Sequence, residues 1–291
     1  MLGSDATVHI ASFLGTTDIA CLGRTCGHFG KSYVWSDGQM TSLVEELAGR
    51  VIDCNTTDYE KSVLVGERKM KMLRELELLR SPLYFKQLIG NSNAIRYSQP
   101  LSTISVSCSG DEYVTAISSH VMRTGRHYAT ICVCGLSNPD NLDFGIKDWD
   151  KQGLDSFDPL CCFRRHHEHR DQLLAERTDE WGDDLHCCSY YSEGGTCYHA
   201  NWCDEDQDHG DEWEGMEPLE ETGQPVGDMY NVKLGLLLDL NSGTLSVFKD
   251  GRLLGVMKEG LTGAYCWCFG SYMATCEVKI ERGIPPATRN N

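Results

Sequence analysis

Residues 230–272 constrain the fold of this chain more strongly than any other stretch. Apolar side chains recur there at every second position, at Val232, Leu234, Leu236, Leu238 and Leu240. This spacing places them on one face of a β-strand. Two turns follow, one at residues 241–243 and one at Asp250 and Gly251, a pair that tolerates the positive φ of a hairpin turn. The stretch therefore predicts an antiparallel meander with one buried face, which is a scaffold and not a catalytic loop.

The same period of two residues extends over residues 101–282. Candidate strands lie at 103–108, 113–118, 127–134, 142–146, 186–191, 197–201, 232–240, 245–249, 253–257, 266–272 and 276–281. Many short strands separated by glycine-containing turns are typical of a sandwich. We therefore expect a mostly β fold, in which residues 101–282 form an antiparallel β-sandwich preceded by an α-helical region.

The amino acids in these strands resemble those of the SPRY family. Residues 235–251 read G-L-L-L-D-L-N-S-G-T-L-S-V-F-K-D-G, and L-G-V follows at 254–256. G-R-H-Y at 125–128 and F-G-I at 144–146 are similar to two further strands of that family. The resemblance implies a β-sandwich that binds a protein or peptide target through loops at one edge.

Residues 4–40 resemble an F-box, the short helical motif that docks on Skp-type adaptors. The match rests on V-H-I-A-S-F-L at 8–14 and D-I-A-C-L at 18–22, whereas the usual Leu-Pro opening is absent. The resemblance implies that the adaptor contacts are Ile10, Phe13, Leu14, Ile19 and Leu22. The alternative is a set of short helices, with a third turn at 29–35, that only cap the sandwich.

Residues 41–100 predict a helical connector. Ser42 and Glu45 have the spacing of a capping box ahead of an apolar helical pattern. A second helix is expected over residues 69–79 and ends at Ser81 and Pro82. Pro82 suits the first turn of a further short helix, which would end at Gly90.

The net charge of −17 argues against a nucleic-acid partner, because phosphate binding needs clustered Lys and Arg. Residues 204–221 hold ten carboxylates and no Lys or Arg. This acidic loop is a solvated segment, or else a cation site or a patch that selects basic partners. Its carboxylates lack the spacing of a calcium-binding loop, so no calcium site is predicted.

The fifteen cysteines do not predict a disulfide framework, since their number is odd and most lie within apolar strand patterns. We expect them to be small buried side chains in a reducing cytoplasmic or nuclear setting, with Cys132, Cys134, Cys187, Cys266 and Cys268 as examples. No apolar stretch reaches the roughly 18 residues of a membrane span, so no membrane partner is expected.

Two groups of Cys and His invite a metal or thiol-enzyme interpretation: Cys161, Cys162, His166, His167 and His169, and Cys197, His199 and Cys203. The chain has no C-x₂-C pair, so we predict no metal and no cofactor. Thiols inside strands are inert, so we predict no enzyme activity; a metal or thiol enzyme is the rival of a different class.

Four aromatic residues are either core packing under loops or part of a surface that binds the target: Trp181, Tyr190, Trp202 and Trp213. Together, the two resemblances imply a protein-interaction adaptor that acts as a substrate receptor of a Skp–cullin–F-box ubiquitin ligase. The sandwich would capture the target. The alternative is a SPRY binding module with no ligase role.

Overall fold

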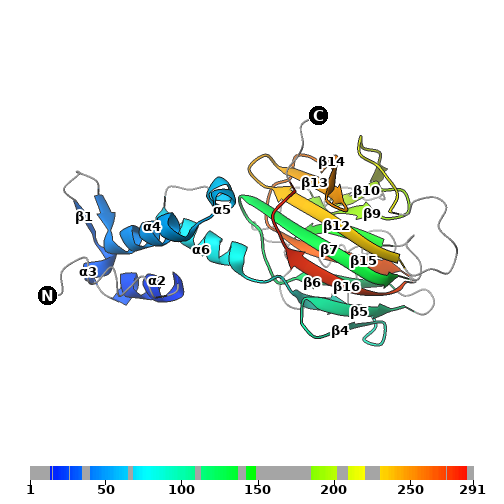
Figure 1. The fold of residues 1–291 in the computed structure, drawn as a ribbon, viewed down its shortest axis with the longest axis horizontal. Helices are drawn as coiled ribbons and strands as arrows, with labels where there is room; N and C mark the ends of the chain where they lie inside the picture. The colour runs from blue at the N-terminus through cyan, green and yellow to red at the C-terminus, as the bar shows by residue number, and fades with distance from the viewer. Residues whose placement is uncertain are drawn as a thin grey trace. The chain divides into compact units, whose positions relative to one another are not determined.

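The computed structural model describes residues 14, 16–25, 27–34, 40–64, 68–108, 113–136, 142–148, 185–201, 209–219, 230–272 and 274–286. The chain divides into two compact units, Met1–Ser81 and Pro82–Asn291 (Figure 1). The first unit is mainly helical and the second is a β-sandwich. The predicted fold class is thus confirmed.

The helical unit contains α2 (Thr16–Thr25), α3 (Gly27–Gly30), α4 (Leu43–Asn55), α5 (Asp58–Val63), α6 (Lys69–Arg80) and a hairpin of β1 (Ser32–Val34) and β2 (Met40–Ser42). Its core is formed by Ile19, Val44, Ala48, Ile52, Leu64, Leu73 and Leu76. These residues come from α2, α4 and α6 and from the end of α5. The unit therefore has a hydrophobic core of its own.

The predicted cap of α4 is half confirmed. The backbone N–H of Glu45 donates to the Ser42 hydroxyl at 3.3 Å, as expected. The Glu45 carboxylate does not complete the box, because it accepts a hydrogen bond from the Met70 N–H at 3.2 Å, at the start of α6. A complete capping box occurs instead at Thr57 and Glu60, ahead of α5.

Two helical predictions are wrong. The third helical turn was expected to reach residue 35, but the observed helix α3 ends at Gly30. The chain then turns into a strand, because Tyr33 pairs with Thr41 in the β1–β2 hairpin. The expected short helix after Pro82 is a strand, β3 (Phe85–Ile89), which pairs with β6 (Tyr113–Ser118). Phe85 and Ile89 are buried in that strand, so sheet pairing overrides the helix-start signal of Pro82. The helical region accordingly ends at Ser81, not at residue 100.

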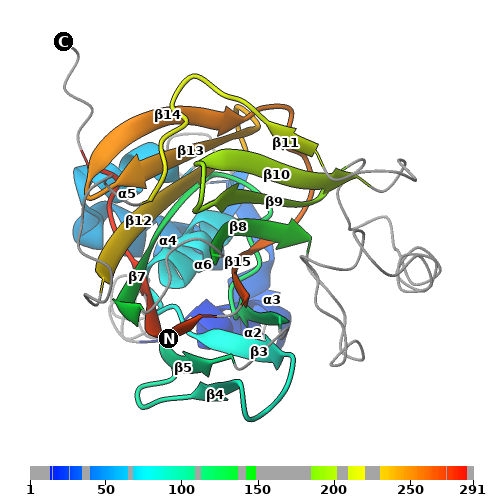
Figure 2. The same cartoon turned by 90° about the vertical axis from the view of Figure 1, so that its right-hand side faces the viewer.

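Within the described residues, the sandwich consists of two sheets of seven strands, and the paired strands are antiparallel. The first has the order β11 (His209–Asp211), β10 (Thr196–Asn201), β9 (Leu185–Tyr191), β8 (Leu142–Asp148), β15 (Tyr265–Tyr272), β6 and β3. The second has the order β14 (Arg252–Lys258), β13 (Thr244–Lys249), β12 (Tyr230–Asp239), β7 (Arg126–Leu136), β16 (Thr275–Arg282), β5 (Thr103–Ser107) and β4 (Ile95–Tyr97). Figure 2 shows the β9–β11 edge of one sheet beside the β13–β14 edge of the other.

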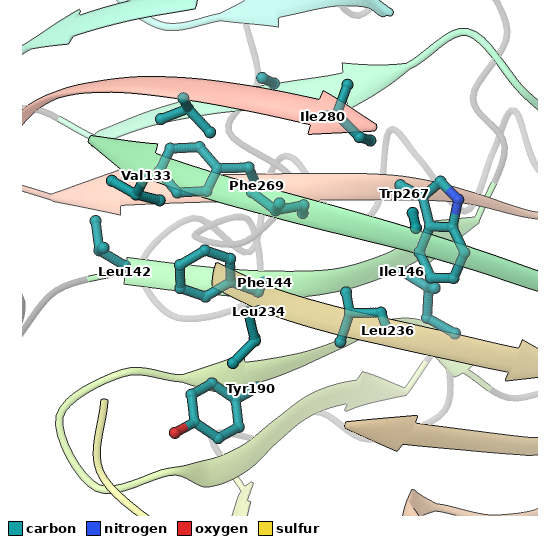
Figure 3. Packing of buried hydrophobic residues seen from close by; sticks show 14 of the residues in the cluster. Val133, Leu142, Phe144, Ile146, Tyr190, Leu234, Leu236, Trp267, Phe269 and Ile280 are labelled. Carbon is teal, nitrogen blue, oxygen red and sulfur yellow. The ribbon is translucent and has the colours of Figure 1, made fainter. Parts of the chain in front are cut away.

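The core lies between the two sheets, as Figure 3 shows. Leu234, Leu236 and Leu238 are fully buried there, which confirms the alternation on which the meander was predicted. Phe144 and Phe269 of the opposite sheet meet edge to face, with ring centroids 5.4 Å apart. The hairpin turn is also confirmed, since φ is 49° at Asp250 and 82° at Gly251.

The cysteine prediction is confirmed only in part. Cys187, Cys266 and Cys268 are buried, whereas Cys132 is half-buried and Cys134 is exposed. Cys132 pairs with Lys233, and Cys134 pairs with Glu277, so both lie on the polar outer face of their sheet. The alternation along β7 is therefore as predicted. The error was to assume that Cys132 and Cys134 lie on its buried face, since both lie on the face that meets solvent.

Candidate functional site

A short segment connects the two sheet edges at one end of the sandwich. We call residues 212–219, which follow β11, the strap. The indole N–H of Trp213 donates to the Gly195 carbonyl at 2.7 Å, at the turn between β9 and β10. The Tyr190 hydroxyl donates to the Glu217 carbonyl, and the Leu219 N–H donates to the Ser192 carbonyl at 2.9 Å. The strap is therefore fixed to the first sheet along most of its length.

The second sheet holds the strap through the Glu217 carboxylate and the Pro218 carbonyl. Lys249 Nζ donates to Glu217 Oε1 at 2.9 Å and to the Pro218 carbonyl at 2.9 Å. Arg252 Nη2 donates to Glu217 Oε2 at 2.6 Å. These bonds, led by that from Arg252, hold the pKa of Glu217 below its ordinary value. Glu217 is thus an ionised bridge between the strap and the β13–β14 hairpin.

Two glycines allow the strap to pack closely. A Cβ at Gly195, where φ is +71°, would lie 2.2 Å from the Glu217 carbonyl oxygen. A Cβ at Gly215 would lie 2.3 Å from the Leu254 carbonyl oxygen in β14. Any larger side chain at either position would push the strap away from the sheet edge it covers.

Exposed apolar side chains lie within the strap and on β14, the edge strand that the strap approaches at Gly215. Met216 is 42% exposed within it, and Leu253 and Val256 of the edge strand β14 are 39% and 45% exposed. Leu253 pairs with Phe248, and Val256 pairs with Ser246 on the same outer face of the sheet. We call Met216, Leu253 and Val256 the rim. An edge strand with exposed apolar side chains is a surface on which a partner segment can pack.

The structure brings together two of the four aromatic residues that the sequence singled out. Tyr190 is fully buried, with its ring in the core and its hydroxyl turned away from Phe144 and Leu234 (Figure 3). Trp213 is half-buried and packs on the same core. Both fix the strap. Trp181 and Trp202 lie outside the described residues, as do residues 204–208 and 220–221 of the acidic loop.

The rim and Glu217 were missed by the sequence reasoning. Leu253 and Val256 lie in a predicted strand, and only the register of β14 with β13 shows that they face outward. The signal that was available was the aromatic Trp213 within a charged segment, which sequence reasoning did select. What it lacked was the pairing of Glu217 with Lys249 and Arg252, which are distant in sequence.

Beside the strap, four side chains have the residue types of a thiol or metal centre. Cys188 and Cys197 Sγ lie 3.6 Å apart, and His199 Nδ1 lies 3.5 Å from Asp211 Oδ2. The hydrogen bond from Cys188 holds the pKa of Cys197 at about 6, and the same contact and burial raise that of Cys188. Cys197 is fully buried in the core between the two sheets, so a substrate could reach it only if the sandwich opened. Over the described part of the chain, no group of His, Cys, Asp and Glu is arranged to hold a metal ion.

In the helical unit, the predicted adaptor contacts have different environments. Leu14 is 37% exposed, whereas Ile19 is fully buried in the unit's own core. Leu22 is half-buried and packs on Leu43 and Leu47 of α4. Ile10 and Phe13 lie outside the described residues. Of the predicted contacts that can be placed, Leu14 has the most accessible surface.

The comparisons with known proteins do not identify a family. No protein-family model matches the sequence, and no characterised protein matches it significantly. Among solved structures, the chain is similar to the SPRY domain of human HERC1, with 14% identity over 66% of this chain and 97% of that chain and a TM-score of 0.39. It is also similar to the PSpry domain of TRIM65, with 10% identity over 71% and 97% and a TM-score of 0.37.

A third similar structure is the carbohydrate recognition domain of Emp46p, with 10% identity over 75% of this chain and 93% of that chain and a TM-score of 0.40. With scores at this level, the sandwich is established by the strand pairing of this chain itself. Within the described residues, no helix combines the length and apolar character needed to cross a bilayer.

Proposed function

We propose that this chain is a protein-interaction adaptor, and that it serves as a substrate receptor of a Skp–cullin–F-box ubiquitin ligase. The observation that carries the proposal is the division into two compact units, each with its own hydrophobic core. Two such units allow one chain to bind two partners. No chemistry takes place on this chain; the rate gain comes from holding the target near a conjugating enzyme. A reducing cytoplasmic or nuclear location fits this role.

The sandwich is proposed to capture the target, in the manner that its SPRY-like sequence implies. The strap and the rim supply the surface, because Met216, Leu253 and Val256 are exposed beside a segment fixed by several hydrogen bonds. A preformed surface loses little entropy when a partner binds. Tyr190 and Trp213 hold this surface in place, and Trp181 and Trp202 are proposed to extend it.

The helical unit is proposed to dock on the Skp-type adaptor. Leu14, just before α2, and Leu22, within it, offer accessible apolar surface, and Ile10 and Phe13 are proposed as further contacts. Ile19 is assigned a supporting role, since its buried side chain positions α2 from beneath. A Phe13→Ala/Leu14→Ala variant removes two proposed contacts without touching the described core.

The test is a pull-down of a purified Skp-type adaptor by the wild-type chain and by Phe13→Ala/Leu14→Ala. A Leu253→Ala/Val256→Ala variant is the matched control, because it removes apolar surface from the sandwich alone. We expect the control to bind the adaptor normally and the first variant to lose binding while its circular dichroism is unchanged. Absence of binding by the wild type would favour the alternative, a SPRY-like binding module whose helices have no ligase role.

A further inference from the structure

A pocket of about 500 Å³ lies within the helical unit, between α2 and α6. Its walls are Thr17, Ala20 and Arg24 from α2 and Arg74, Glu77 and Leu78 from α6, with Ser81 at the end of α6. Residues 17, 20 and 24 share one face of a helix, and so do residues 74, 78 and 81. The pocket is therefore a groove formed where two regular helix faces meet.

The two arginines in the walls have no carboxylate partner in the described residues. Arg24 makes only a weak contact, from Nη2 to Cys21 Sγ at 3.7 Å. Arg74 makes no ion pair with any described residue. Its positive charge acts only as a lesser influence on the neighbouring Glu75, where it lowers a pKa that burial raises. By contrast, Arg50 pairs with Glu46 at 2.7 Å, and Arg80 pairs with Glu60 at 2.6 Å.

Charge and shape together define what the pocket can hold. The guanidinium groups of Arg24 and Arg74 are suited to bidentate contact with a carboxylate, and the Thr17 hydroxyl can donate a further hydrogen bond. The Ser81 hydroxyl already donates to the Leu78 carbonyl at 2.8 Å. Ala20 and Leu78 supply an apolar patch for the methylene groups of the incoming side chain. One carboxylate, Glu77, also lies in the wall and offsets part of the positive charge of the two arginines, which favours a singly charged anion over a doubly charged one.

We propose that this pocket binds an Asp or Glu side chain of the Skp-type adaptor. The inference rests on the proposed function, because it places the contact on α2, the same helix that carries Leu22. Leu14 would pack on apolar adaptor surface, while Arg24 and Arg74 fix the orientation of the complex through a directional ion pair. Partner contacts of this kind chiefly set specificity and association rate.

The test measures the dissociation constant of purified adaptor by calorimetry at two salt concentrations. The variant is Arg24→Glu/Arg74→Glu, and Lys61→Glu/Arg68→Glu is the matched control with the same change of charge on the same unit. We expect the first variant to weaken binding by about 10-fold or more and to lose the salt dependence. The control should remain within about 2-fold of the wild type. Circular dichroism checks that both variants are folded.

Each outcome separates the two proposals. A wild type that does not bind the adaptor overturns the ligase role and this contact together. If the wild type and the Arg24→Glu/Arg74→Glu variant bind the adaptor with equal affinity, the ligase role is retained and the pocket contact alone is overturned. Adaptor treated with phosphatase should bind unchanged; a loss of binding would show that the pocket takes a phosphate and would refute the carboxylate.

Discussion

Acid should destabilise the sandwich through two buried histidines. His120 and His127 are 6% and 3% exposed, with ring centroids 5.3 Å apart. Burial, with the Arg282 and His127 charges as lesser causes, lowers the pKa of His120 to about 3. Burial also lowers the pKa of His127 to about 4, although its Nε2–H donates to the Thr124 carbonyl at 2.7 Å, and Arg282 lowers it further. Both rings are therefore neutral in the folded protein at pH 5.

The direction and the size of this destabilisation by acid follow from proton linkage. In the unfolded chain both histidines take up a proton below about pH 6.5, whereas the folded chain does not. The free energy of unfolding should therefore fall as pH drops from 6.5 toward 4, by about 1.4 kcal/mol per pH unit for each ring. At pH 5 each histidine should have lowered the free energy of unfolding by about 2 kcal/mol relative to pH 6.5 and above. This is a large fraction of the unfolding free energy of about 5–15 kcal/mol that is typical of a domain.

The assay is urea unfolding of the wild type and of His127→Gln at several pH values between 7 and 4.5. Gln can still donate to the Thr124 carbonyl, but it cannot take up a proton. We expect the difference in unfolding free energy between the two proteins to shrink by about 2 kcal/mol between pH 7 and pH 5, because only the wild type loses this contribution. A difference that is constant with pH would refute a depressed pKa at His127.

Two further changes test the strap and the core. Gly195→Ala should displace Glu217 and expose the strap, which limited proteolysis would detect as faster cleavage between residues 212 and 219. Gly260→Ala is the control, because Gly260 also has a positive φ of +76° but a Cβ there would have nothing within 4 Å, so the cleavage rate should be unchanged. Leu236→Ala should lower the free energy of unfolding by about 2–5 kcal/mol in urea titrations, and the half-buried Leu240→Ala by less.

The strands of the sandwich could be predicted because their period is local. Residues 113–118 were predicted as a strand and are observed as one, and 245–249 differs from β13 by a single residue. β3 and β11 were missed for different reasons. The pattern of β3 is masked by the helix-start signal of Pro82, whereas β11 (His209–Asp211) lies in an acidic run with no apolar alternation and, among the described strands, pairs with β10 alone.

The strap could not be predicted, because its contacts join residues far apart in the chain. Alternation along a strand shows which side chains face the core, but it does not show which segment crosses the edge of the finished sheet. The Glu217 carboxylate is one of ten in residues 204–221, and only its contacts with Lys249 and Arg252 distinguish it from the others. The same holds for Arg24 and Arg74, since the packing of α2 against α6 brings them to one pocket. Both candidate surfaces therefore depend on tertiary contacts, whereas the sandwich that supports one of them can be predicted from periodicity alone.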